Sequence, residues 1–108
     1  MMGFSDIEAI VYEWLTKRGI PFSFQVPFFG GRFSLGGAVI DFVLDNGLLW
    51  RIQGEYYHTG VKKEGTDAVQ RELLESEGFT VIDLWSSDIE DRTEETLSKA
   101  LLGQEMLH

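Results

Sequence analysis

Residues 37–58 constrain the fold more than any other part of the chain, because an acidic residue stands inside an apolar run that then turns back on itself. Asp41 follows Ala38, Val39 and Ile40 and precedes three further apolar residues. Burying an ionised carboxylate costs free energy unless a cation or strong hydrogen-bond donors compensate it. The returning segment ends in a polar and aromatic cluster at residues 53–58. The pattern therefore predicts a β-hairpin with a compensated carboxylate in its first strand.

The turn between the two strands decides which side chains share a face of this hairpin. A two-residue Asn-Gly turn would place Asp41 opposite Ile52. A three-residue Asp-Asn-Gly loop closing on a glycine bulge would instead place Asp41 opposite Arg51, with Gln53 diagonal to it. We expect the second register, since it groups three polar side chains and leaves Ile40 paired with Ile52 in the core. A shift of one residue would reverse the two faces.

The remaining periodicities predict a mixed α/β fold. We expect a helix opened by the capping-box pattern at residues 5–8 and ended at Gly19, because apolar residues recur there at helical spacing. Residues 59–66 are expected to form a loop. The other expected elements are strands 22–28, 38–44, 48–53 and 79–85, a helix from about 67 to 77 with Gly78 as its cap, and a last helix between 87 and 103. The order α-β-β-β-α-β-α corresponds to a mixed sheet flanked by helices.

Composition limits the class of protein. The 108 residues are enough for one core, so we expect a single domain over residues 1–108. The chain has no cysteine, which excludes disulfides, thiol nucleophiles and Cys-ligated zinc. No signal-peptide pattern or long uninterrupted apolar span is present, so we expect a cytoplasmic protein with no membrane partner.

The net charge of −9 argues against tight non-specific DNA binding by this chain alone. Most of the excess acidity lies late in the chain: the first 71 residues hold 8 of the 18 acidic and 7 of the 9 basic side chains. An acidic protein of this size that acts on DNA is expected to work as a homodimer or within a larger nucleic-acid-processing assembly.

Three stretches together carry a more specific pattern. They are Glu8-x-x-Val11-Tyr12-x-x-Leu15 with Gly19-Ile20-x-Phe22-x-x-Gln25, then Ile40-Asp41-Phe42 with Gln53-Gly54-Glu55-Tyr56-Tyr57-His58, and finally Asp67-x-x-x-Arg71-x-x-Leu74-x-x-x-Gly78-Phe79-x-Val81. In this order and spacing they resemble the restriction-endonuclease-like PD-(D/E)XK superfamily. The most similar branch contains the very-short-patch repair endonucleases, the DUF559-type proteins and the EDxHD homing endonucleases.

The resemblance implies a restriction-endonuclease-like fold and a metal-dependent DNA endonuclease or nickase that hydrolyses phosphodiester bonds. It implies Mg²⁺, with Mn²⁺ as a substitute, bound by Asp41 with help from Glu8 or from a backbone carbonyl near Ile52. His58 is then expected to move the proton, Asp67 to orient His58 or the metal-bound water, and Gln53 to position the nucleophile.

DNA contacts follow from the same resemblance. Tyr56 and Tyr57 fall where relatives carry aromatic side chains that stack on bases. The other residues expected to contact DNA are Arg51, Lys62, Lys63 and Arg71, and the candidates for phosphate contacts are Lys62, Lys63, Arg18 and Arg32. Arg51 departs from the family pattern, because many members have a second acidic ligand at its position. The absence of cysteine also excludes the structural zinc of the repair enzymes.

Three of the candidates have an ordinary structural explanation as well. Asp41 can pair with Arg51 across the hairpin, Glu8 can serve as the acceptor arm of the capping box, and Asp67 can stabilise the start of a helix. Two alternatives from other functional classes follow. One is a catalytically inactive nuclease-fold module for DNA binding or protein assembly, and the other is an unrelated small α/β interaction protein with a structural Asp41–Arg51 pair.

Overall fold

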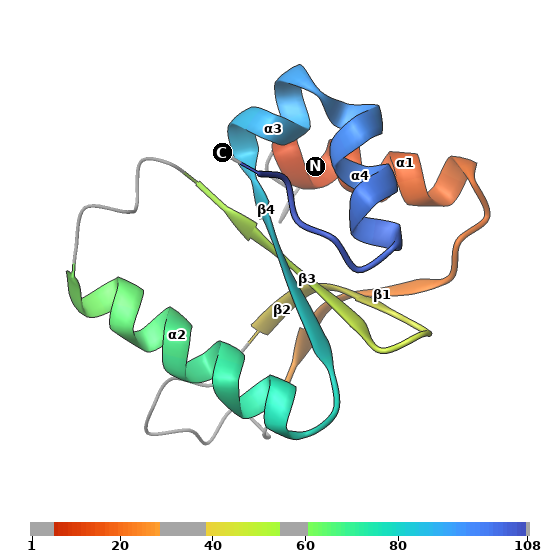
Figure 1. The fold of residues 1–108 in the computed structure, drawn as a ribbon. Helices are drawn as coiled ribbons and strands as arrows, with labels where there is room; N and C mark the ends of the chain where they lie inside the picture. The colour runs from red at the N-terminus through yellow and green to blue at the C-terminus, as the bar shows by residue number, and fades with distance from the viewer. Residues whose placement is uncertain (1–5, 29–38, 55–60, 108) are drawn as a thin grey trace.

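The computed structural model describes residues 6–28, 39–54 and 61–107, with the backbone alone over residues 61–67. Its elements are α1 (Asp6–Lys17), β1 (Phe22–Pro27), β2 (Val39–Leu44), β3 (Leu48–Gln53), α2 (Val61–Ser76), β4 (Thr80–Trp85), α3 (Ser86–Asp91) and α4 (Thr93–Leu101) (Figure 1). The expected order is confirmed, and the expected last helix is divided into α3 and α4 at Arg92.

The sheet has the strand order β1-β2-β3-β4. The first two pairings are antiparallel, and β3 pairs with β4 in parallel, with α2 as the crossover between them. Phe42 lies opposite Trp50 and Val43 opposite Leu49, so the hairpin loop has the expected three residues. Gly47 adopts a φ of +84°, which a glycine bulge requires and other residues rarely adopt.

One face of the sheet packs against α1, α3 and α4 (Figure 1). The apolar residues that recur at helical spacing in α1 form its core face, with Val11, Trp14 and Leu15 buried and Ile7 and Ile10 packed beside them. The buried residues that the other elements contribute to this cluster are Phe42, Leu44, Leu48, Trp50, Ile82, Leu84, Ile89, Leu97 and Ala100.

The other face packs against α2 (Figure 1) through a smaller cluster of Ile40, Leu49, Leu74 and Val81. Ile52 packs instead against the larger cluster, so the expected core pair of Ile40 and Ile52 is wrong. Side chains two residues apart in a regular strand share a face. Ile40 and Phe42 nevertheless belong to different clusters, and Asp41 is the residue between them.

Helix α2 begins at Val61, so the loop expected over residues 59–66 is wrong from residue 61 onward. Residues 62–66 lack apolar periodicity, so the core pattern gives no sign of a helix there, although Lys62, Lys63 and Glu64 are residue types that favour helices. Asp67 therefore lies inside α2 and not at its start. Gly78, with a φ of +96°, follows the helix as expected. No helix in the described ranges is long and apolar enough to cross a membrane.

Candidate functional site

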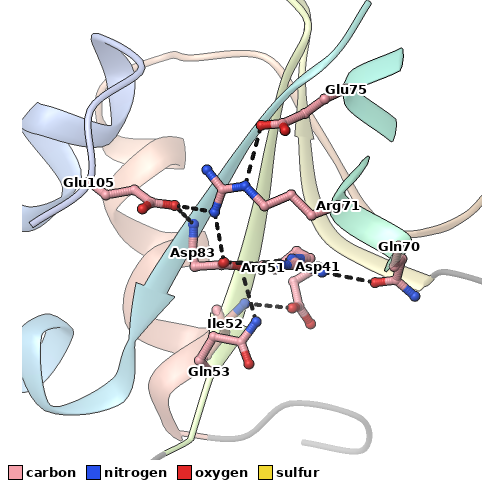
Figure 2. Close-up of polar contacts among 9 residues, drawn as sticks. All are labelled: Asp41, Arg51, Ile52, Gln53, Gln70, Arg71, Glu75, Asp83 and Glu105. Atoms are coloured by element: carbon pink, nitrogen blue, oxygen red, sulfur yellow. Dashed lines mark hydrogen bonds and ion pairs between the residues drawn. The ribbon is translucent and has the colours of Figure 1, made fainter. Parts of the chain in front are cut away.

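Asp41 lies in the middle of β2 and binds the backbone of the neighbouring strand. Its Oδ2 accepts a hydrogen bond from the Ile52 N–H at 2.8 Å (Figure 2). The described pairs of the β2–β3 register end at Phe42 and Trp50, immediately before this position. The side chain of Asp41 therefore accepts the hydrogen bond from the Ile52 N–H that a backbone carbonyl would accept in a regular antiparallel ladder.

Glu8, in the first turn of α1, meets Asp41 through its side chain. The pKa of Asp41 is raised from 3.8 to about 6, chiefly by burial and against the opposing effect of the Ile52 N–H. Glu8 contributes to this rise by charge repulsion and by accepting a hydrogen bond from the protonated acid. Glu8 and Asp41, called the carboxylate pair below, are thus two acids that cannot both ionise without cost. Ser5, the other member of the expected capping box, lies outside the described residues.

Arg51 directs its guanidinium at β4. Its Nε lies 2.7 Å from Asp83 Oδ1 and its Nη2 lies 3.0 Å from Asp83 Oδ2, while Nη1 donates to Gln70 Oε1 at 3.1 Å (Figure 2). Arg51 lowers the pKa of Asp41 through its charge, but its bidentate partner is Asp83. Arg51 therefore pairs with Asp83. It does not form the isolated ion pair with Asp41 that the alternative of a small interaction protein assumes.

Asp83 is the centre of a larger set of polar contacts on the α2 face. Gln53 Nε2 and Arg71 Nη1 also donate to it, at 3.1 and 3.0 Å. Burial alone would raise the pKa of Asp83, but the hydrogen bonds and charge of Arg51, with help from Gln53 and Arg71, hold it below its usual value. Glu105 completes the set by accepting bonds from Arg71 Nη1 at 2.8 Å and from the Asp83 N–H at 2.9 Å. We call Arg51, Gln53, Gln70, Arg71, Asp83 and Glu105 the Asp83 network.

Asp83 and Glu105 were not among the residues singled out from the sequence. A signal for Asp83 was present, since a lone acid stands in the apolar strand TVIDLW as Asp41 does in VIDFVL. Glu105 follows the last helix, where the local pattern offers no such signal.

The structure brings Glu8 and Asp41 together, and it gathers Arg51, Gln53 and Arg71 around Asp83. Arg51 is only 6% exposed, which leaves little of it to reach a phosphate. The expected site residues Tyr56, Tyr57 and His58 lie outside the described residues. For three others, only the backbone is described, within the first turns of α2; these are Lys62, Lys63 and Asp67.

The carboxylate pair fits a hard divalent cation. Magnesium is bound in proteins by oxygen ligands, often by one or two carboxylates completed by water and substrate phosphates. A cation would also remove the repulsion that raises the pKa of Asp41. Among the described side chains, no group of three or more histidine, cysteine or acidic residues gathers at a possible metal position. The pair therefore offers two ligands.

A comparison with solved structures finds a similar fold. No protein-family model matches the chain, and no curated protein sequence matches it. Among solved structures, it is similar to the catalytic domain of the homing endonuclease I-Bth0305I, with a TM-score of 0.69 and 19% sequence identity over 92% of this chain and 96% of that one. The four-stranded mixed sheet with its flanking helices is thus a fold that this endonuclease domain shares.

Proposed function

We propose that the protein is a metal-dependent DNA endonuclease or nickase of the very-short-patch or DUF559 kind. The observation that carries the proposal is the carboxylate pair. Two acids from separate elements meet inside a fold similar to that of a homing endonuclease catalytic domain. A purely structural core gains nothing from bringing together two acids that repel each other.

Hydrolysis of a phosphodiester bond needs neutralisation of the charge on the phosphate and activation of water, and a divalent cation supplies both. In this proposal Asp41 and Glu8 hold Mg²⁺ or Mn²⁺. The Ile52 N–H fixes one oxygen of Asp41 at 2.8 Å, so the carboxylate is oriented before any ligand arrives. Such prior orientation limits the entropy lost on binding.

The remaining roles are assigned by resemblance. His58 moves the proton, because imidazole titrates near neutral pH without further help. Asp67 orients His58 or the attacking water, and Gln53 positions that water. The bond from Gln53 Nε2 to Asp83 supports the last role, since it fixes the orientation of the Gln53 amide.

DNA is the proposed partner, and the proposed contacts come from several residues. Tyr56 and Tyr57 stack on bases while Lys62 and Lys63 contact phosphates. Arg51 and Arg71 contribute less directly, because both already bind carboxylates in the Asp83 network. We propose that the protein acts as a homodimer, which doubles the contacts with DNA, or within a larger assembly, which would add the basic surface that a chain of net charge −9 lacks.

A cleavage assay tests the proposal. Nicked, mismatched and branched DNA are incubated with Mg²⁺ or Mn²⁺ and with wild type, Asp41→Asn or Asp45→Asn. Asp45 is a matched control, since it is an exposed acid in the loop of the same hairpin. Wild type and Asp45→Asn should cut, whereas Asp41→Asn should lose at least 100-fold in rate, a loss that mutation of an essential group commonly exceeds. Equal rates for all three proteins would overturn the proposal.

One observation favours a second candidate, a nuclease-fold module without catalysis that serves DNA binding or assembly. In the described part of the chain, two acids form the candidate metal site, and Arg51 stands where a further acid is common in the family. DNA binding by wild type without cleavage of any substrate, unchanged by Asp41→Asn, would support this module.

A further inference from the structure

Gln25 has an unusual backbone conformation. With a φ of +51°, it is the single residue other than glycine in the described ranges that adopts a positive φ. The left-handed region crowds the Cβ of an L-residue, and glycine, asparagine and aspartate adopt it at less cost than glutamine. A glutamine held there points to a constraint from its surroundings.

The position of Gln25 in the sheet places this strain beside the carboxylate pair. The β1–β2 register pairs Phe24 with Phe42 and Val26 with Ile40, so Gln25 lies opposite Asp41. Gln25 and Asp41 are themselves not among the paired residues of these two strands. Asp41 is thus flanked by two departures from regular sheet geometry, one at Gln25 in β1 and one at the Ile52 N–H in β3.

The side chain of Gln25 forms a hydrogen bond with the second acid of the carboxylate pair. Its Nε2 donates a hydrogen bond to Glu8 Oε2 at 3.3 Å, linking the strand opposite Asp41 to the helix that carries the second acid. An asparagine would tolerate the backbone better, but its amide is one methylene shorter. A glycine would tolerate it best and has no amide at all.

We infer that Gln25 is a positioning residue whose strained backbone aims its amide at Glu8 and so holds the Glu8 carboxylate beside Asp41. The inference rests on the proposed function, because it deepens the account of the same cation site. Partners that orient ligand side chains commonly change metal affinity by about 10- to 100-fold when removed.

The test uses two variants that lose the amide equally but differ in backbone strain. Gln25→Ala keeps a Cβ at positive φ, whereas Gln25→Gly removes it. Ser23→Ala is the matched control, because Ser23 is exposed two residues earlier on the same face of β1. Mn²⁺ affinity is measured by calorimetry without DNA, the melting temperature is measured without metal, and crystal structures are determined without metal.

Both Gln25 variants should lose about tenfold in Mn²⁺ affinity, with Ser23→Ala unchanged. Gln25→Gly should nevertheless melt about 4 °C higher than Gln25→Ala. In a Glu8→Ala background, Gln25→Ala should cause no further loss, since Gln25 acts through Glu8. Wild-type affinity in Gln25→Ala, or a loss confined to Gln25→Gly, would overturn the inference and assign Gln25 to strand shape alone.

The crystal structures separate this inference from the proposed function. If wild type binds no Mn²⁺, the proposed metal site fails, but Gln25→Ala should still show the Glu8 side chain turned away from Asp41. If Glu8 stays beside Asp41 in that variant, the positioning role fails whatever the metal does.

Discussion

The Oδ2 of Asp41 accepts a hydrogen bond from the backbone N–H of Ile52 at 2.8 Å, so the strand beside this acid supplies one of the donors it needs. That donor lowers the pKa of Asp41, but burial and the neighbouring Glu8 outweigh it and bring the pKa to about 6. At neutral pH and without metal, the Asp41 carboxylate is therefore ionised, and its burial and the nearby Glu8 make this ionised form less favourable.

Protein stability should consequently fall as the pH rises through the acidic range. The folded state holds the Asp41 proton up to a pKa of about 6, whereas the unfolded chain releases it near 3.8. The free energy of unfolding should thus fall between about pH 4 and pH 6. For a pKa shift of this size the fall is at most about 3 kcal/mol. The lowered pKa of Asp83 acts in the opposite direction and below this window.

Urea unfolding at a series of pH values in low salt and without metal measures this dependence. Asp41→Asn should flatten the curve between pH 4 and pH 6, and Glu8→Gln should reduce its slope, since Glu8 contributes to the shift. A wild-type stability that stays constant or rises across the window would show that Asp41 is not under electrostatic strain.

Asp83→Ala should strongly destabilise the fold. It removes the carboxylate that binds Arg51, whose side chain is 7% exposed, and leaves that guanidinium buried without its bidentate partner. Breaking a buried pair by removing one partner costs about 3–5 kcal/mol. The double variant Arg51→Met with Asp83→Leu should cost less than Asp83→Ala, because it leaves no unpaired charge.

The control for Asp83 is an exposed ion pair in the same protein. The side chains of Lys17 and Glu13 are 71% and 66% exposed, so Glu13→Gln should change the free energy of unfolding by less than about 0.5 kcal/mol. Denaturant titrations of all the variants give the comparison. A cost for Asp83→Ala no greater than that of Glu13→Gln would remove Asp83 from the centre of the network.

Glu105→Ala should loosen β4 locally. Strand β4 lies at the edge of the described sheet, and its Asp83 N–H donates to Glu105 at 2.9 Å. Losing this bond to a charged acceptor costs about 1.5–3 kcal/mol, which predicts at least a tenfold loss of hydrogen-exchange protection at the Asp83 amide. Gln104→Ala, at the exposed neighbouring position, should leave that protection unchanged. Equal protection in the two variants would contradict the capping role of Glu105.

Local features of the chain were enough to predict the element order and the hairpin register. Alternating apolar residues and a loop ending in Gly47 act over a few residues, and neither is overridden by distant contacts. The start of α2 was missed for a related reason. The first turns of α2, VKKEGT, carry no apolar periodicity, so a pattern based on the core cannot detect them.

The candidate site depended more on contacts between distant residues. The hairpin pattern alone left Asp41 as the natural partner of Arg51, but Asp83, 32 residues further along the chain, takes the guanidinium. The positive φ of Gln25 was equally inaccessible, because β1 shows a regular alternation of half-buried and exposed residues that gives no sign of it.

The most direct test of the central claim is a crystal structure of the protein soaked in Mn²⁺, with anomalous scattering used to locate the ion. The carboxylates of Asp41 and Glu8 define the expected position. The account predicts an anomalous peak beside both carboxylates in wild type and its loss in Asp41→Asn. No peak there, with the guanidinium of Arg51 turned from Asp83 to fill the space beside Asp41, would contradict it.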